Sequence, residues 1–238
     1  MTLLVKTPWG HLLDAPAMQF SGQLIHLLLL HQVRHQPADE LWFAVDGKLL
    51  KFTYNDFKRV TGIKDQVECA TYDFDKSRLG VVDKYFGGCV DVTYGKLKAK
   101  VEEIRNTLME PNEDVMDRVK LASLFFVHSC LLARDPPTRI RPAHLCLVDE
   151  FEVFKSCPWS LESYNVTVKS LKKTMKGQPE KFQAKKKKKP KYRNAKFSLY
   201  GFPFALQVWA YEELPVLAQK FAKRVSTTRD VPILKWTA

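Results

Sequence analysis

Apolar residues recur at helical spacing along most of the chain. The segment from Ser21 to about Gln36 is apolar over most of a helical circumference, which predicts a helix buried on several sides. Pro37 follows it and predicts its end. The same spacing predicts helices at Leu97 to Leu108, Val115 to about Ala133, Leu145 to Phe154, Tyr164 to Met175 and Phe204 to about Phe221, the last broken or kinked at Pro215.

The segment from Leu41 to Thr53 follows a different, alternating pattern. Apolar residues occupy every second position on both sides of Asp46-Gly47, a residue pair that favours a tight primed turn. The pattern predicts a β-hairpin. Thr53 can then cap a short helix, with Asp56 at its third position in a capping-box role and Gly62 as its terminator.

The remaining segments have weaker patterns. Residues 64–90 lack clear periodicity, and we expect them to be rich in loops. Asn112 is a candidate cap for the helix that begins at Val115, and the tail from Pro232 to Trp236 reads as extended.

These elements predict a mostly α fold, in which one multi-helix globular domain carries a small β-hairpin near residues 41–53. Residues 1–176 and 197–238 would form this domain, and residues 177–196 would be a Lys-rich flexible loop. A composition with 45% hydrophobic and 12% aromatic residues supplies enough apolar surface for a packed core.

The positive charge is concentrated in one segment, from Lys169 to Lys196. It holds thirteen of the 38 basic residues and one of the 26 acidic residues. Its net charge therefore equals the +12 of the whole chain, and the rest of the sequence is balanced. A concentrated charge is more informative than a diffuse one, because it can act as a binding element or an address.

Three interpretations of this segment remain open. It is a solvated loop, a nuclear address read by an import receptor, or a non-specific contact to nucleic-acid phosphates; the last two are compatible. If about six charges neutralise DNA phosphates, log affinity should fall with log salt with a slope near −5. The candidate residues are Lys185, Lys186, Lys187, Lys188, Lys189, Lys191 and Arg193.

The cysteines and the N-terminus bear on the compartment. The five cysteines form no CxxC pair, which argues against a disulfide framework and favours a reducing environment. No signal peptide is recognisable, and the longest strongly apolar run, Leu27 to Leu30, is far too short for a membrane span. We therefore expect a soluble intracellular protein without membrane contact.

Known catalytic motifs are missing from the sequence. It has no Gly-rich phosphate loop, no nucleophile elbow and no HExxH motif. His31 and His35 could share a helical turn and hold a metal, but without a third ligand nearby we interpret them as exposed polar positions. Asp149 with Glu152 has helical spacing, and a solvated face explains this pair better than acid–base chemistry. We expect no enzyme activity and no cofactor.

The same reasoning applies to other paired or reactive residues. Glu212 and Glu213 are adjacent, so they do not face each other on a helix. Cys157 lies in Ser-Cys-Pro-Trp, a context that indicates packing, and Cys130 and Cys146 fall in apolar helices as small core residues.

Several short sequence motifs follow one another in a fixed order along the chain. They are Gly10–Asp14, Ser21–Leu29, Glu40–Phe43 with the Asp46-Gly47 turn, Phe52-Thr53, Phe57 with Val60–Ile63, Arg118–Ala122, His144–Asp149, Pro158-Trp159, Ser170–Lys172 and Tyr200–Glu212. This ordered series, which covers about Trp9 to Trp236, resembles a plant domain of unknown function that is widespread in transposon-derived proteins.

The resemblance implies a nuclear plant protein of mobile-element origin and no established activity. In that family the domain often precedes a SUMO-protease-like cysteine peptidase, and no His/Asp/Cys set placed as that protease requires is found in this chain. We therefore expect a non-catalytic nuclear interaction module that contacts protein or nucleic acid. The alternative is an accessory or substrate-recognition domain of such a peptidase, whose catalytic domain is missing from this chain.

Overall fold

The computed structural model describes residues 2–64, 80–88, 91–107, 115–175 and 198–237, and it is mostly helical with a small antiparallel hairpin. This confirms the predicted fold class. The predicted Asn112 cap and the lysine segment beyond residue 175 lie outside the described residues.

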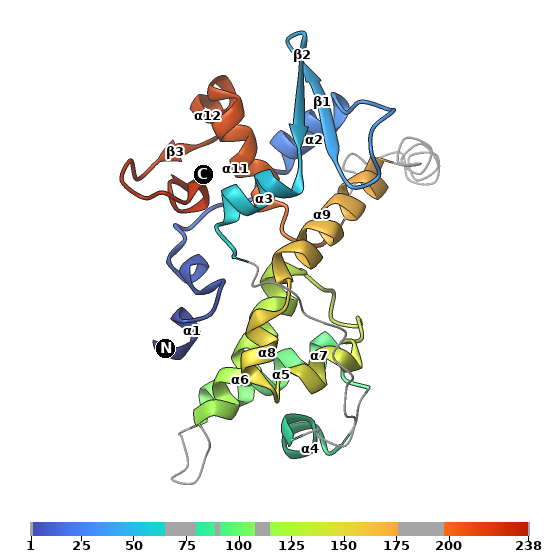
Figure 1. Ribbon diagram of the computed structural model, residues 1–238, viewed down its shortest axis with the longest axis vertical. Coiled ribbons are helices and arrows are strands. Elements are labelled where there is room, and N and C mark those ends of the chain that lie inside the picture. The colour runs from blue at the N-terminus through green and yellow to red at the C-terminus, as the bar shows by residue number, and fades with distance from the viewer. Residues whose placement is uncertain (1, 65–79, 89–90, 108–114, 176–197, 238) are drawn as a thin grey trace, which may run out of the picture.

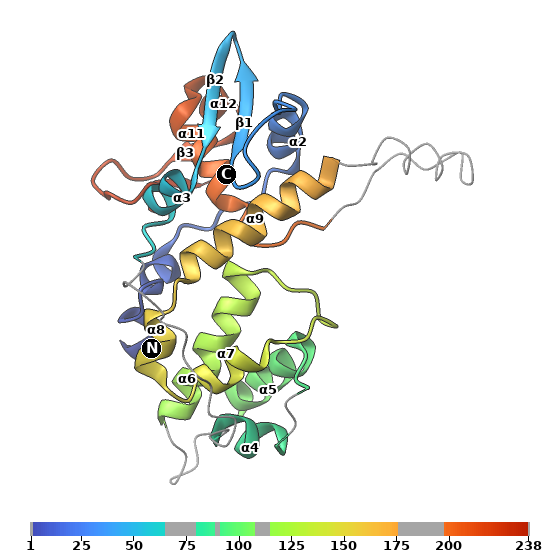
Figure 2. The ribbon, with the colours of Figure 1, turned by 45° about the vertical axis from the view of Figure 1, so that its right-hand side comes forward.

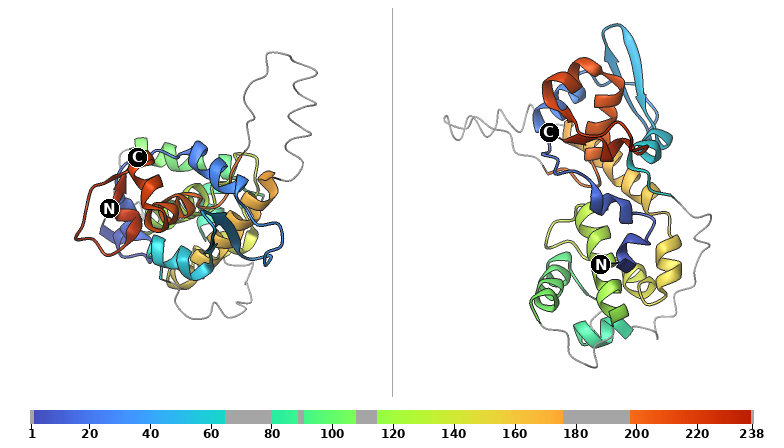
Figure 3. Two further views of the ribbon diagram at one scale, coloured as in Figure 1. Left: turned by 90° about the horizontal axis from the view of Figure 1, so that it is seen from above. Right: turned by 90° about the vertical axis from the view of Figure 1, so that its left-hand side faces the viewer.

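The elements form two halves that share helix α9 (Figures 1 and 2). The half drawn at the top holds α2 (Gly22–Leu30), β1 (Leu41–Val45), β2 (Lys48–Phe52), α3 (Tyr54–Thr61), α11 (Phe204–Glu213), α12 (Pro215–Phe221), β3 (Lys223–Arg224), η3 (Pro232–Leu234) and β4 (Trp236–Thr237). The other half holds α1 (Thr2–Val5), η1 (Gly10–Asp14), α4 (Gly80–Phe86), α5 (Tyr94–Asn106), α6 (Val115–Phe126), the π-helical η2 (Val127–Leu131), α7 (Pro142–Leu147) and α8 (Phe151–Ser156). Helix α9 (Trp159–Met175) runs through both. Figure 3 shows the N-terminal end beside the lower half and the C-terminal end beside the upper half.

One cluster of buried apolar side chains continues through both halves. In the upper half, the ring of Trp209 from α11 lies 5.7 Å from that of Phe43 and 5.4 Å from that of Phe52. In the lower half, the ring of Trp9 packs edge-on against those of Phe154 and Trp159. Aromatic side chains bury a large apolar area each, so these contacts anchor the hairpin and the N-terminus to the helices.

The hairpin and the cap after it form as predicted. Asp46 and Gly47 both have positive φ, 48° and 72°, as a two-residue primed turn requires. At the start of α3, the backbone N–H of Thr53 donates to Asp56 Oδ2 over 3.0 Å, and the Thr53 hydroxyl oxygen accepts from the N–H of Asp56. Gly62 ends α3 in the left-handed conformation with φ 68°.

The helix expected to reach Gln36 ends at Leu30 instead. The chain leaves the helix because the next residues pair with β1: Val33 N–H donates to Trp42 O, and Ala44 N–H donates to His31 O, each over 2.9 Å. The prediction was wrong at this end, since tertiary pairing replaces the last helical turns.

Other predicted boundaries shift as well. The single helix expected from Leu145 to Phe154 is two helices, α7 and α8. The helix expected from Val115 to Ala133 changes to π-helical pairing at Val127 and ends at Leu131. The tail from Pro232, expected to be extended, contains a 3₁₀ turn before strand β4. The predicted break at Pro215 is present, between α11 and α12.

Candidate interaction groove

A mostly apolar groove of about 490 Å³ lies between α2, the hairpin and the junction of α11 with α12. Figures 1 and 2 show this arrangement, with α12 on the β2 side of the hairpin and α2 on the β1 side. The apolar lining comes from segments far apart in sequence: Leu27, Leu28, Val45, Leu50, Leu214, Pro215, Val216 and Leu217.

Large apolar side chains remain exposed on and around this groove. Val216 is 77% exposed, Leu30 58%, Leu49 50% and Leu27 36%. Leu27 and Leu30 lie three positions apart on α2, so they share one side of that helix. Clustered apolar exposure of this kind is typical of a surface that contacts another molecule.

The break at Pro215 builds one wall of the groove. Leu214 leaves the helical conformation, with φ −130° and ψ 80°, and Pro215 then starts α12 without needing a backbone donor. The turn brings Val216 and Leu217 against the groove.

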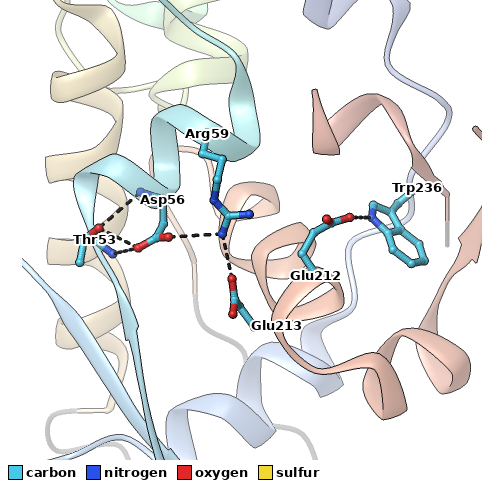
Figure 4. Close-up of polar contacts among 6 residues, drawn as sticks. All are labelled: Thr53, Asp56, Arg59, Glu212, Glu213 and Trp236. Atoms are coloured by element: carbon cyan, nitrogen blue, oxygen red, sulfur yellow. Dashed lines mark hydrogen bonds and ion pairs between the residues drawn. The ribbon is translucent and has the colours of Figure 1, made fainter. Parts of the chain in front are cut away.

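Polar contacts hold this wall against its neighbours (Figure 4). Arg59 Nη2 of α3 lies 2.9 Å from Glu213 Oε1 and 3.3 Å from Asp56 Oδ1, which links the capping box to the end of α11. Glu212 accepts a 2.6 Å hydrogen bond from Trp236 Nε1. The two adjacent carboxylates therefore serve separate contacts. The Arg59 pair is solvent-exposed, so it contributes at most about 1 kcal/mol.

A second polar cluster lies in the other half, beside a cavity of about 680 Å³. His144 Nδ1 is 3.1 Å from His128 Nε2, and His144 Nε2 is 2.7 Å from Arg141 Nη2. Arg141 also pairs with Glu162 Oε1 over 2.5 Å. Glu162 Oε2 also lies 3.4 Å from His144 Nε2, so this nitrogen faces both an arginine donor and a carboxylate, and the direction of the His144–His128 hydrogen bond follows the tautomer.

Burial keeps this histidine pair neutral. The pKa of His128 falls to about 2 through burial first and then through the neighbouring His144. Burial also lowers the pKa of His144. The remaining nitrogen of His128, Nδ1, is buried without a hydrogen-bond partner.

Cys157 lines the same cavity, and its thiol donates to Val153 O over 3.3 Å. His144 Nε2 is in contact with Arg141 Nη2 and Glu162 Oε2. A nucleophile–base pair requires a histidine nitrogen that can take the proton of the thiol. The contacts of Cys157 and His144 are those of a packed polar network. The sequence analysis missed the contact between His128 and His144, because their spacing along the chain gives no sign of it.

The basic and histidine residues singled out in the sequence do not form a described site. Lys185, Lys186, Lys187, Lys188, Lys189, Lys191 and Arg193 lie outside the described residues. His31 and His35 do not share a helical turn, because α2 ends before them, and His31 Nδ1 contacts Leu27 O. Among the described residues, no group of three or more His, Cys, Asp or Glu side chains could hold a metal ion.

The solvated-face interpretation of Asp149 is wrong. Its carboxylate accepts the backbone N–H of Val81 at the start of α4, over 3.1 Å, and pairs with Lys120 at 3.7 Å. Asp149 therefore ties α4 to the break between α7 and α8. Glu152 instead pairs with Lys155 at the surface.

Residues 29–170, more than half of the chain, match the family model described as "Domain of unknown function (DUF1985)". The chain belongs to this family. No curated protein and no solved structure matches it. The DUF1985 match includes the hairpin, α3 and most of α9, whereas the α11–α12 wall of the groove lies beyond it. In the part of the chain described here, no helix is long and apolar enough to cross a membrane.

Proposed function

We propose that this DUF1985 protein is a non-catalytic interaction module that acts in the nucleus and binds a segment of a partner protein in the groove between α2, the hairpin and α12. The observation that carries the proposal is the groove itself, with Leu27 and Val216 exposed in its apolar lining.

The energetics favour an occupant of this kind. Complete burial of one Leu or Val side chain stabilises by about 1.5–3 kcal/mol. Covering the exposed parts of Leu27 and Val216 supplies about 1–3 kcal/mol towards binding, before the cost of ordering the partner. A segment that lies across the groove reaches Leu27 on one side and Val216 on the other.

The nuclear part of the proposal is supported by the lysine run at Lys185–Lys189, followed by Lys191 and Arg193. A cluster of this type is read by import receptors, and it can contact phosphates without reading bases. A reporter fused to residues 169–196 should accumulate in the nucleus. The same reporter with Lys185–Lys189 changed to glutamine should not, and a wild-type fusion that stays cytoplasmic would remove this part of the proposal.

The groove is tested by selecting a random peptide library on the purified protein. The selection is repeated on Val216→Asp, which places a charge on the most exposed apolar position, and on Val5→Asp. Val5 is also exposed, at 51%, but it is the last residue of α1, which lies in the other half of the molecule. We expect peptides enriched on wild type and Val5→Asp to be lost on Val216→Asp. Equal enrichment on all three proteins would refute the groove as the binding surface.

A further inference from the structure

The hairpin leaves one backbone edge without a partner. In its two-stranded sheet, the outer edge of β1 is occupied, because Trp42 O accepts from Val33 N–H and Ala44 N–H donates to His31 O. No described residue pairs with the outer edge of β2. Such an edge is a template for an added strand.

The register identifies the free backbone groups. Trp42 lies opposite Lys51, and Ala44 lies opposite Leu49. In an antiparallel ladder, opposite residues direct their N–H and C=O groups either both inwards or both outwards. The groups of Trp42 and Ala44 point outwards to residues 31–33, so those of Leu49 and Lys51 point outwards on the β2 side.

The side chains along this edge read Lys48-Leu49-Leu50-Lys51. Lys48 and Leu50 line the groove together with Val45, whereas Leu49 points to the opposite face and is half exposed. Both lysines are exposed, and neither forms an ion pair with a described carboxylate. Lys51 Nζ lies 4.4 Å from the ring centre of Trp42, its cross-strand neighbour on β1, so this ammonium leans towards β1 and would turn outwards to meet an added strand.

We propose that β2 binds an extended segment of a partner protein by strand addition, and that the segment carries the pattern acid–apolar–apolar–acid. The proposal rests on the proposed function and specifies the chemistry of the groove's ligand. Backbone hydrogen bonds to Leu49 and Lys51 would supply affinity, and the cross-strand side chains would supply specificity. One apolar residue opposes Leu50 on the groove side and the other opposes Leu49.

Charge selects this occupant over a second copy of the chain. Pairing β2 with another β2, with Leu49 of each copy opposite Lys51 of the other, would place the two Lys51 side chains diagonally across the strand pair on one face, where their like charges repel. A segment with acids at both ends of the apolar pair forms opposite-charge pairs with Lys48 and Lys51.

The test uses a fluorescein-labelled peptide, Ser-Thr-Glu-Ile-Val-Glu-Thr-Ser, and fluorescence anisotropy with the full chain. We expect saturable binding, weakened at least tenfold by Lys48→Glu or Lys51→Glu. The double variant should instead bind the peptide in which both glutamates are lysine. Lys6→Glu, an exposed charge reversal after α1, should change nothing. Circular dichroism of each variant reports whether it folds.

N-methylated peptides separate an added strand from a helix without changing the protein. In antiparallel pairing, the residue opposite Leu49 is the valine, whose N–H points at β2, while the N–H of the isoleucine points away. N-methylation at the valine should abolish binding, and N-methylation at the isoleucine should be tolerated. If N-methylation at the valine and at the isoleucine changed peptide binding equally, strand addition would be overturned.

Different results would refute strand addition at β2 and partner binding in the groove. If the probe does not bind, or ignores the charge reversals, while library-selected peptides still lose binding on Val216→Asp, strand addition is wrong and the groove stands. If the selected peptides bind Val216→Asp as well as wild type, and the probe does not bind or ignores the charge reversals, both are wrong.

Discussion

The buried pair His128–His144 predicts that the protein loses stability between pH 7.5 and pH 5.0. An unfolded histidine has a pKa near 6.5, while burial lowers the pKa of folded His128 to about 2. Below pH 6.5 the unfolded chain therefore binds a proton that the folded chain does not. A depressed folded pKa in a base gives stability that is present above pH 6.5 and is lost as the pH falls.

The magnitude follows from the proton linkage. When one histidine is protonated only in the unfolded chain, the free energy of unfolding falls by about 1.4 kcal/mol for each pH unit below 6.5. His128 alone therefore lowers the free energy of unfolding by about 2 kcal/mol at pH 5.0. The pKa of His144 is also lowered, chiefly by burial, so this residue acts in the same direction. The wild-type loss between pH 7.5 and 5.0 is thus expected to be at least about 2 kcal/mol from this pair.

The assay is urea unfolding at pH 7.5, 6.0 and 5.0, followed by tryptophan fluorescence. Trp159 reports on the site directly, because its ring lies 4.9 Å from that of His144. His128→Gln removes the titrating ring and keeps a hydrogen-bonding group beside His144, so its pH-dependent loss should be smaller than that of wild type by about 2 kcal/mol. The quantity compared is the change in the free energy of unfolding with pH, which does not depend on how stable the variant is at pH 7.5.

His26→Gln provides the matched control, since His26 is exposed on α2. It should keep the wild-type pH dependence. If His128→Gln also kept it, His128 would have the same protonation in the folded and unfolded states, and the neutral buried pair described here would be refuted.

Three further predictions concern the fold, the chemistry and the lysine segment. Gly201 has φ 84°, and an added Cβ would lie 2.5 Å from the backbone nitrogen of Thr167, so Gly201→Ala should cost about 2 kcal/mol or more in urea unfolding. Gly22→Ala, where a Cβ meets no atom within 4 Å, is the control, and equal costs would contradict the close packing. Purified protein should leave a SUMO fusion intact in a gel assay; cleavage that disappears in Cys157→Ser would overturn the non-catalytic proposal. Binding to duplex DNA should weaken with salt at a log–log slope near −5 and lose most of that dependence when Lys185–Lys189 become glutamine, whereas undetectable or salt-independent binding would exclude phosphate contact.

The elements that could be predicted are those whose signals are local. Asp46-Gly47 specifies a primed turn through its own backbone preferences, and Thr53 with Asp56 forms a cap within four residues. The early end of α2 could not be predicted, because it depends on the pairing of Gln32 with Phe43, eleven positions away and on a strand.

The groove could not be predicted from the sequence patterns either. Leu27 and Val216 have the same apolar character as residues in the core, and only the packing of α2 and α12 on the two sides of the hairpin leaves both exposed. His128 and His144 come from elements separated by Pro136-Pro137, so their contact is a product of the tertiary fold.

The proposed partner-binding surface of this protein is the groove between α2, the hairpin and α12. Its most direct test is the affinity of a library-selected peptide for wild type, Val216→Asp and Val5→Asp under identical conditions. We predict an affinity at least tenfold weaker for Val216→Asp and unchanged for Val5→Asp. Equal affinities for all three folded proteins would contradict this proposal.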